Sequence, residues 1–278
     1  MYFTPISRAI HPTLPRIPKS ERSANIQNLI RDQFSLKTWL LLGAAAQSIL
    51  LLLPLRPTYN IAPAFLLLTL QLVDSVLVTL GWKRNIMIDG TIGRRVSALQ
   101  PDHKFDPKNP NFANGKIAVL HLGFRINHPL GILAPGARDI AAHFMAMMKE
   151  LNKSASTNGF LGHESYHNTS RTSKSELLQV MYFRSLSDID AFAHGPVHRE
   201  GWNWWNATVK QHRHLGISHE VFEALRGKWE NVYVNYHETG MGAMRWPVVD
   251  GEGKEGWVGG LVEAGRGALV THKGRIAV

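Results

Sequence analysis

The chain has 278 residues, of which 44% are hydrophobic and 19% charged, so length and composition fit one or two folded domains and exclude wholesale disorder. Cysteine is absent, which excludes disulfides, cysteine-ligated zinc, iron–sulfur clusters and a haem thiolate ligand. The formal net charge is +10, but the basic residues flank two apolar runs and do not follow one face of a fold, which argues against nucleic acid as a partner.

Two apolar runs lie near the N-terminus. Residues 38–55 carry no formal charge, and residues 61–82 are interrupted only by Asp74 before the final basic flank. A membrane-spanning helix needs about 20 mostly apolar residues, so residues 37–84 are predicted to form a membrane-anchoring helical hairpin. Asp74 favours the alternative, two buried helices of a soluble domain, because a carboxylate in lipid is costly. In the hairpin it would be protonated or hydrogen-bonded to Gln47.

The charges flanking the hairpin predict its orientation. Residues 1–36 form a basic N-terminal segment, and Lys83 and Arg84 follow the second run, whereas the loop between the runs carries only Arg56. Because positively charged flanks stay in the cytosol, both ends of the hairpin are expected there. We therefore expect an endoplasmic reticulum protein with its catalytic domain facing the cytosol. Residues 85–114 are predicted to be a linker.

A change of periodicity after the linker predicts a folded domain. Alternating apolar residues indicate strands, and apolar residues three and four apart indicate helices. A serine cap at Ser187 and proline after glycine at Gly195-Pro196 predict two helical starts. The predicted strands are residues 116–127, 159–170, 175–185, 216–224 and 229–238, and the predicted helices are residues 137–151, the stretch from Ser187, and residues 196–211.

The order of these elements predicts the fold class. A β-α-β-β-α-β order with one extra strand indicates a ferredoxin-like α+β domain over residues 115–250, with an antiparallel sheet covered on one face by helices. The uncovered face would be buried by a second copy, which predicts a homodimeric α+β barrel. No periodic element is predicted in the glycine-rich tail, residues 251–278.

Four segments carry a resemblance to a known family. In chain order they read LHLGFRIN, YFRSLSDIDAFAHGPVHREGWNWWN, GISHEVFE and ENVYVNYHETGMGAM. They resemble the DUF4188 monooxygenase-like family of the dimeric α+β barrel superfamily, over roughly residues 115–250. The preceding hairpin is similar to the fungal members, which often belong to secondary-metabolite gene clusters. The superfamily includes cofactor-free oxygenases, haem degraders and haem aldoxime dehydratases, so the resemblance implies a fold and a pocket more than one reaction.

Two histidines are the candidate catalytic residues. The resemblance matches a helix-borne histidine to His198, the candidate ligand if haem binds, and a strand histidine to His219. His219 lies on an apolar strand face, where a neutral imidazole can transfer a proton near cytosolic pH. The alternatives are a capping histidine and a core histidine. His194 and His198 have the spacing of a zinc pair, but the intervening Gly-Pro break and the missing third ligand argue against a metal site.

Two tryptophans are candidate substrate-binding residues. Trp202 and Trp205 follow His198 at helical spacing, so they are expected to share a face with it and to wall a flat apolar pocket. The alternative is that they only pack the helix against the sheet.

Four polar residues complete the candidate substrate site. Arg125 suits a substrate carboxylate, which a guanidinium binds bidentately. Tyr182, Tyr233 and Asn235 offer hydrogen bonds to an oxygenated ligand, with Tyr233 and Asn235 on one face of the last predicted strand. Each residue is a weak signal alone, and the hypothesis is that they converge on one pocket.

The function predicted from these features is a membrane-anchored monooxygenase-like enzyme of fungal secondary metabolism. Its substrate would be a hydrophobic, terpenoid- or polyketide-like metabolite held between helices and sheet, with no cofactor required. Three alternatives remain: a cofactor-free, pericyclase-like cyclase or isomerase, a haem enzyme ligated by His198, and a non-catalytic membrane-tethered binding protein. No dinucleotide loop or Ser-His-Asp arrangement is recognisable, which argues against NAD-dependent enzymes and hydrolases.

Overall fold

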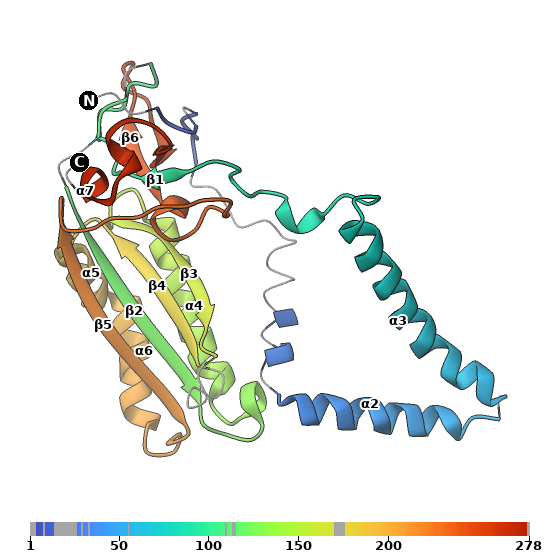
Figure 1. Ribbon diagram of the computed structural model, residues 1–278. Coiled ribbons are helices and arrows are strands. Elements are labelled where there is room, and N and C mark those ends of the chain that lie inside the picture. The colour runs from blue at the N-terminus through green and yellow to red at the C-terminus, as the bar shows by residue number, and fades with distance from the viewer. Residues whose placement is uncertain are drawn as a thin grey trace. The chain divides into compact units, whose positions relative to one another are not determined.

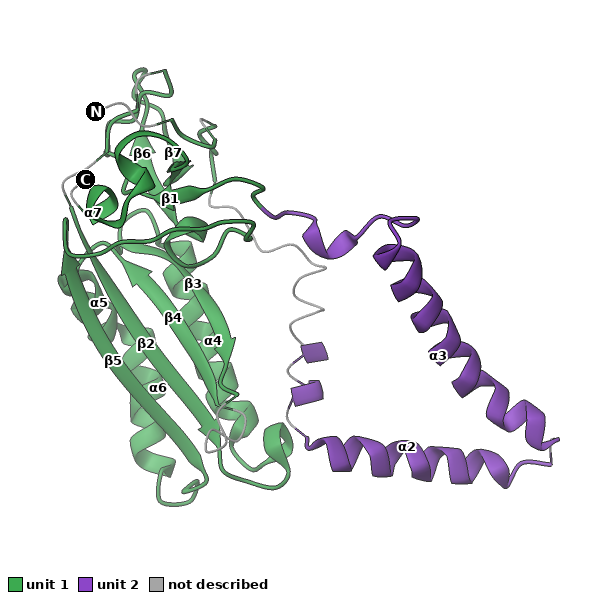
Figure 2. Cartoon of the chain, viewed as in Figure 1, with its two compact units in different colours: residues 1–23, 92–278 green, residues 24–91 purple. Residues whose placement is uncertain are grey.

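The computed structural model describes residues 4–7, 9–13, 27–28, 30–32, 34–54, 56–108, 110–112, 115–169 and 176–276. The chain divides into two compact units, residues 24–91 and residues 92–278 together with residues 1–23 (Figure 2). Much of the predicted basic N-terminal segment lies outside the described residues.

The smaller unit contains two apolar helices, α2 (Leu36–Leu51) and α3 (Pro57–Thr79). Ser35 caps α2 by accepting a hydrogen bond from the Thr38 backbone N–H at 3.2 Å, and Pro57 begins α3. Asn60 is the only buried residue in the two helices, so their apolar side chains are exposed. By length and composition α3 is able to cross a membrane, whereas α2 is apolar but shorter.

The polar side chains of these helices have partners other than those expected. Gln47 donates a hydrogen bond to the Asn60 carbonyl oxygen at 3.1 Å, and Asp74 forms an ion pair with Lys83. The expected hydrogen bond between Asp74 and Gln47 was therefore wrong. Asp74 lies in the last two turns of α3, where the long side chain of Lys83 reaches back to it from beyond the helix end.

The larger unit is built on a four-stranded antiparallel sheet. Its strands lie in the spatial order β3 (Phe160–His167), β4 (Leu177–Phe183), β2 (Lys116–Ile126) and β5 (Leu215–Leu225). One face is covered by helices α4 (Ala137–Lys153), α5 (Leu186–Ala193) and α6 (Pro196–Thr208) (Figure 1). The first and third strands of the β-α-β-β-α-β order lie at the centre, which confirms the ferredoxin-like prediction.

The core between sheet and helices follows from the predicted periodicities. Ala118 and Leu120 alternate along β2 toward the helices, and Met148 and Leu151 lie one turn apart on α4. These side chains pack with Phe183 of β4 in one buried cluster. The local apolar pattern therefore decides which face of each element is buried.

The start of α5 and its separation from α6 depend on serine, glycine and proline. The Ser185 hydroxyl accepts a hydrogen bond from the Asp188 backbone N–H at 3.3 Å, so the cap is Ser185 and the predicted cap at Ser187 was wrong. Ser185 is the last extended residue, whereas Ser187 already lies in the first helical turn. The predicted break at Gly195-Pro196 is confirmed, with Pro196 beginning α6.

Gly201 allows α6 to pack closely on α4. A Cβ atom at this position would lie 2.4 Å from the Cε of Met147, closer than real side-chain contacts permit. Because Cε is the end of a flexible side chain, a larger residue here would require the Met147 side chain to move, and the glycine lets it pack against α6 as it does.

The second face of the sheet is partly covered by the chain itself. Two small antiparallel sheets, one helix and two short 3-10 helices gather at one end of the main sheet (Figure 1). They are β1 (Val96–Ala98) with β8 (Leu261–Glu263), β6 (Arg245–Val249) with β7 (Glu255–Gly259), α7 (His272–Ile276), η3 (Gly240–Ala243) and η4 (Gly267–Val270). Met244, Trp246 and Val258 from this region pack with Ile117 and Leu161 of the main sheet. The predicted linker and tail thus contribute to the hydrophobic core.

Residues 229–238 do not form the predicted strand. They pair only through isolated bridges, Val96 with Tyr233 and Ile92 with Tyr236, and Asn235 has a positive φ of 48°. A strand here would need a continuous partner, but the three-residue β1 is already paired with β8. Asn235 tolerates the left-handed conformation that turns the chain.

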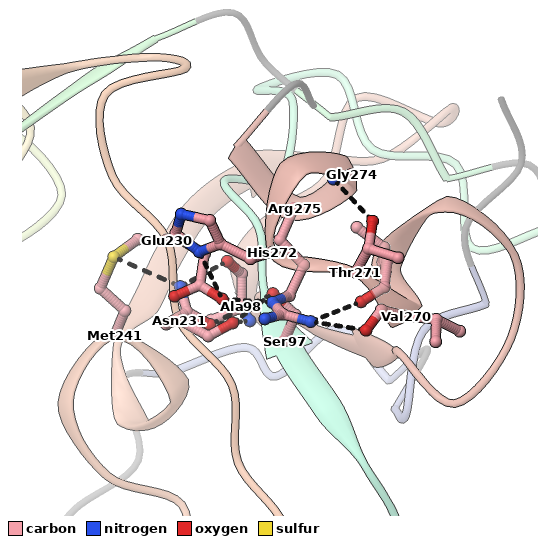
Figure 3. Close-up of polar contacts among 11 residues, drawn as sticks. Ser97, Ala98, Glu230, Asn231, Met241, Val270, Thr271, His272, Gly274 and Arg275 are labelled. Carbon is pink, nitrogen blue, oxygen red and sulfur yellow. Dashed lines mark hydrogen bonds and ion pairs between the residues drawn. The ribbon is translucent and has the colours of Figure 1, made fainter.

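The C-terminal helix is tied to the chain that follows β5 (Figure 3). The Arg275 side chain is buried and forms an ion pair with Glu230. Its Nη1 donates to the carbonyl oxygens of Leu269 and Val270 at 2.9 and 3.0 Å. The guanidinium therefore links α7, η4 and the segment after β5.

The residue after Glu230 extends this polar contact to β1 (Figure 3). The Asn231 amide accepts a hydrogen bond from the Ala98 backbone N–H at 2.5 Å and donates to the Ala98 carbonyl at 3.0 Å. The Ser97 hydroxyl donates to the Asn231 carbonyl at 3.0 Å. Because these groups lie far apart in sequence, the contact closes the small β1–β8 sheet onto the rest of the unit.

Candidate functional site

His198 lies in the first turn of α6, just after the break that separates α5 from α6. Its ring is half-buried and contacts Phe192 edge-on, with ring centroids 5.2 Å apart. Phe192 in turn packs on the core between helices and sheet. Because Pro196 starts the helix two residues earlier, the Gly-Pro break determines where this imidazole is presented.

His219 lies on the outer strand β5 and faces the same side of the sheet. It is paired in register with Leu122 of β2, and directly opposed residues of antiparallel strands share a face. Leu122 packs on the helix-side core, so His219 points toward the helices. His219 is close enough to act electrostatically on His198. Both predicted catalytic histidines therefore lie on the helix side of the sheet, His198 half-buried and His219 exposed, and we call them the histidine pair.

The surroundings of His198 favour a neutral imidazole. Burial lowers the pKa of His198 below its ordinary value of 6.5, and the nearby His219 and His194 lower it further, against an opposing hydrogen bond with the Ala193 backbone. At neutral pH the ring is therefore uncharged. Such a ring can accept a proton or bind a metal ion.

A third histidine on this side of the sheet was missed by the sequence analysis. His163 of β3 is opposite Met181, and its ring stacks on Phe160 with centroids 6.2 Å apart. Burial lowers the pKa of His163 below 6.5. Simple alternation places residues 160 and 163 on opposite faces. A register shift between Phe160 and Gly162, with Gly162 at φ 143°, brings them to the same face.

The two candidate tryptophans differ in their surroundings. Trp202 is 50% exposed. Trp205 packs with Ile126 and Leu215 in a separate cluster, which lies at the ends of β2 and β5 away from Leu122. Trp205 therefore supports the packing of α6 on the sheet, and the two rings do not stand together beside His198.

Arg125 lies on the opposite face of the sheet from the histidine pair. In β2 it alternates with the buried Ile126, and it is paired with Gly216 of β5. Among the described residues, its buried Nε has no hydrogen-bond partner. Arg125 is therefore separated by the sheet from His198 and His219.

Tyr182 and Tyr233 are also on the opposite face, where they meet. A Cβ atom at Gly240 would lie 3.3 Å from the Tyr182 hydroxyl and 3.5 Å from that of Tyr233, so both hydroxyls converge on this glycine. The Gly242 backbone N–H donates to the Tyr233 hydroxyl at 3.2 Å. Burial raises the pKa of Tyr233 to about 12 and raises that of Tyr182 above its ordinary value. Both phenols are therefore neutral at physiological pH.

A carboxylate adjoins these tyrosines. Glu164 of β3 accepts hydrogen bonds from the Tyr166 hydroxyl at 2.5 Å and the Thr239 hydroxyl at 2.7 Å. It also contributes to raising the pKa of Tyr182. Glu164, Tyr166 and Thr239 were not singled out in the sequence, because only the fold brings β3 beside η3. We call Glu164, Tyr166, Tyr182, Tyr233 and Thr239 the tyrosine cluster; Asn235 lies outside it on an exposed turn.

The candidate residues are thus divided between two faces of one sheet. The histidine pair lies on the helix side, and Arg125 and the tyrosine cluster lie on the other side. Residues of β2 and β4 alternate between faces, so Arg125 and Tyr182 cannot reach a ligand held beside His198 in the same chain. The histidine pair is the stronger candidate for chemistry because its members are a neutral base and a neighbouring imidazole.

A small cavity in the larger unit is lined by residues that belong neither to the histidine pair nor to the tyrosine cluster. Its volume is about 110 Å³, and His11, Glu238 and Arg245 are among its lining residues. Arg245 and Glu238 form an ion pair there at 2.5 Å. Ligand sites for drug-sized molecules usually occupy about 300–1,000 Å³, so this cavity is too small to be the site of a hydrophobic metabolite.

Whether the candidate site can bind haem iron or another metal ion depends on His198. Its neutral imidazole has the donor chemistry of an axial haem ligand. His194, which ends α5, is exposed, and its Nδ1 lies 2.8 Å from the Asp190 carbonyl oxygen, so it serves as a capping group. The part of the chain that the structure describes contains no group of three or more side chains able to hold a metal ion.

Fold and site together define a ferredoxin-like α+β protein with a histidine pair on the helix side of its sheet and an apolar helical unit before the domain. The family described as Monooxygenase af470-like matches residues 117–241. The monooxygenase af470 of Aspergillus fumigatus is 32% identical over 268 residues, which cover 93% of this chain and 94% of that protein. The chain belongs to the Monooxygenase af470-like family. The matched region lies within the predicted residues 115–250, and the family bears this description instead of the DUF4188 name that the motifs suggested.

Solved structures show weaker, partial similarity. A cofactor-independent oxygenase from Streptomyces nogalater is 13% identical, with 40% of this chain and 94% of that chain covered and a TM-score of 0.28. An aldoxime dehydratase in complex with butyraldoxime is 15% identical, with 54% and 39% covered and a TM-score of 0.38.

Proposed function

We propose that the protein is a membrane-anchored monooxygenase of secondary metabolism that acts on a hydrophobic, terpenoid- or polyketide-like metabolite. The observation that carries this proposal is the histidine pair on the helix-covered face, in a chain of a monooxygenase family. The substrate would lie between α5, α6 and β5. A lipophilic substrate is consistent with an enzyme held at a membrane, where such molecules concentrate.

In the proposed reaction His198 acts as a general base. Its neutral ring takes a proton from a substrate C–H bond that a neighbouring carbonyl activates, and the ring N–H of His219 donates a hydrogen bond to the oxygen of the enolate that forms. Dioxygen then adds to the electron-rich carbon. A CH₂ group becomes a carbonyl, one oxygen atom enters the product, and the other leaves as water. The substrate supplies all the electrons, so no external reductant or cofactor is required.

Isotope labelling distinguishes oxygenation from the cyclase or isomerase alternative. We expect that, in the source organism grown under ¹⁸O₂, a lipophilic metabolite that disappears on deletion of the gene carries one heavy oxygen atom. An unlabelled metabolite that depends on the gene would instead show rearrangement without oxygenation. Restoring the gene controls for indirect loss of the metabolite. A metabolite profile that does not change on deletion would contradict any enzymatic role.

The connectivity of the two units supports a hairpin that crosses the membrane twice. Residues on both sides of α2 and α3 belong to the larger unit, since Pro5 pairs with Val262 and His11 with Trp257 in isolated bridges. One folded unit lies on one side of a membrane. The segment that contains α2 and α3 begins and ends in this unit, so it must cross the membrane an even number of times. The Lys- and Arg-rich flanks favour the cytosolic side, as expected for a domain facing the cytosol from the endoplasmic reticulum.

A second copy of the chain is the proposed partner at the uncovered part of the sheet. Phe222 of β5 is 52% exposed there, and its ring contacts His121 of β2 with centroids 5.4 Å apart. Burying this aromatic surface would favour a homodimer through the sheets.

An absorption spectrum tests the haem alternative. We expect the full-length protein, purified in detergent from cells supplied with haem, to show no Soret band, because the proposed reaction needs no cofactor. The matched comparison is His198→Ala. A Soret band that this substitution removes or shifts would contradict the cofactor-free proposal and assign His198 as the iron ligand.

A further inference from the structure

A short turn after α3 exposes an unusual amount of apolar surface. The 3-10 helix η1 (Ile86–Ile88) has side chains that are 72%, 84% and 61% exposed at Ile86, Met87 and Ile88, and Trp82 is 77% exposed. Isolated exposed apolar residues are common, but three consecutive large ones, four residues after an exposed tryptophan, concentrate apolar surface in one short segment.

The exposure is produced by a hydrogen-bonded turn. The Asn85 side chain accepts a hydrogen bond from the Met87 backbone N–H at 2.9 Å. The Asp89 and Thr91 backbone N–H groups donate to the carbonyl oxygens of Ile86 and Ile88, each at 3.1 Å. The Met87 N–H and the carbonyl oxygens of Ile86 and Ile88 are thereby hydrogen-bonded locally, which lowers the cost of placing them in an apolar surrounding.

A tight hydrogen-bonded turn ends α3 shortly before η1. Gly81 has a φ of 74°, and its N–H donates to the Val78 carbonyl at 3.1 Å, while the Trp82 N–H donates to the Leu77 carbonyl at 2.9 Å. This is the hydrogen-bond pattern of a Schellman motif, which ends a helix and redirects the chain. Trp82 therefore lies directly at the C-terminal end of α3, and η1 begins four residues further along the chain.

The length of α3 determines how deep its C-terminal end would lie in a bilayer. With 23 residues at about 1.5 Å each, α3 is about 34 Å long, slightly more than the roughly 30 Å hydrocarbon core of a bilayer. If α3 spans the bilayer, its end lies at the boundary between acyl chains and headgroups. Tryptophan is enriched at that boundary.

The charges around the turn are paired. Lys83 forms an ion pair with Asp74, and Arg84 forms one with Asp89 at 2.5 Å. The segment therefore has no unpaired charge among these four residues with which to attract anionic lipid. Its attraction to a membrane would come from apolar side chains and would not require acidic headgroups.

We propose that residues 82–88 form an interfacial anchor that inserts Trp82, Ile86, Met87 and Ile88 at the headgroup–acyl boundary of the bilayer that α3 spans. This inference rests on the proposed membrane anchoring. The partner is a lipid surface, because the patch follows closely on an apolar helix, three backbone polar groups of η1 are hydrogen-bonded locally, and the four nearby charges are paired.

Site-specific fluorescence tests the anchor, since the chain contains no cysteine and one introduced cysteine gives one label. Full-length Met87→Cys, labelled with an environment-sensitive dye, is reconstituted in neutral phosphatidylcholine vesicles containing shallow or deep spin-labelled lipids. Leu68→Cys in α3 and Glu252→Cys in an exposed turn are the matched references. We expect the Met87 label to be quenched most by shallow spin labels, the Leu68 label most by deep ones, and the Glu252 label by neither.

Other outcomes separate this inference from the proposed anchoring. A deeply quenched Leu68 label with an unquenched, iodide-accessible Met87 label would overturn the interfacial anchor and leave the membrane hairpin intact. A Met87 label shielded from both iodide and lipid quenchers would show that protein covers the turn, which also overturns it. An unquenched Leu68 label would contradict the hairpin itself. Adding Ile86→Ser and Ile88→Ser should move the Met87 label toward water without changing the quenching at Leu68.

Discussion

Replacing His198 or His219 with alanine is expected to lower product formation by about 10²–10⁴-fold, the usual contribution of a positioned general acid or base. His198 is the half-buried neutral base, and His219 is the exposed imidazole on the same side of the sheet. Because the two would act on one proton transfer, the double variant should be little worse than the more damaging single variant. The measurement is the amount of the metabolite that depends on the gene, made by each variant at matched protein level in membranes.

The pH profile adds a readout that a purely structural role would not change. Activity requires neutral His198, so it should fall as pH drops through the pKa of that ring, which burial places below 6.5. His103→Ala, at an exposed position of the same unit, is the matched control and should keep wild-type activity. A folded double variant with unchanged product formation would remove the enzymatic assignment to this pair and favour the membrane-tethered binding protein.

Replacing Arg275 with alanine is expected to destabilise the larger unit by about 3 kcal/mol, since removal of one partner from a buried ion pair leaves the other charge without compensation. Arg275 is buried, and Glu230, its partner, is only partly exposed and would rehydrate incompletely. Two carbonyl acceptors in η4 also lose their donor. For a unit of this size the loss corresponds to a fall in Tm of roughly 6–12 °C. Thermal unfolding followed by circular dichroism measures it.

Two matched variants test whether the loss of stability comes from the buried contacts of Arg275. Arg266→Ala removes an exposed arginine nearby and should change the unfolding free energy by less than about 0.5 kcal/mol. Arg275→Lys keeps the positive charge but loses the planar guanidinium group that donates several hydrogen bonds at once. Its effect on the unfolding free energy should therefore lie between those of Arg266→Ala and Arg275→Ala. If Arg275→Ala melts at the wild-type temperature, the buried contact of Figure 3 does not hold the C-terminal segment in solution.

The elements of the central domain could be predicted because their signals are local. Alternation over residues 116–126 and helical spacing over residues 137–153 each bury one side of one element, so the pattern specifies both the element and its inner face. The Gly195-Pro196 break is equally local, since proline removes a backbone donor and glycine ends a helix. The candidate histidines followed from these elements and from the family motif.

Where local patterns were ambiguous, the prediction failed. Residues 229–238 alternate like a strand, but a strand needs a partner ladder, and the neighbouring β1 is short and already paired. His163 was missed because the register shift near Gly162 reverses the alternation that would place it. Glycine-rich residues 251–276 have little periodicity, yet Trp257 and Val258 are buried there by contacts distant in sequence.

The sequence by itself determined the order of elements in the ferredoxin-like domain, the apolar helical segment before it and the two histidines most suited to acid–base chemistry, since each depends on neighbouring residues or on helix and strand periods. Only the tertiary structure decided which candidates share a site. Strand register and order place His219 beside the helices with His198, and the alternation of β2 and β4 turns Arg125 and Tyr182 to the other face. Register depends on pairing between distant strands, so no local pattern in one strand contains it.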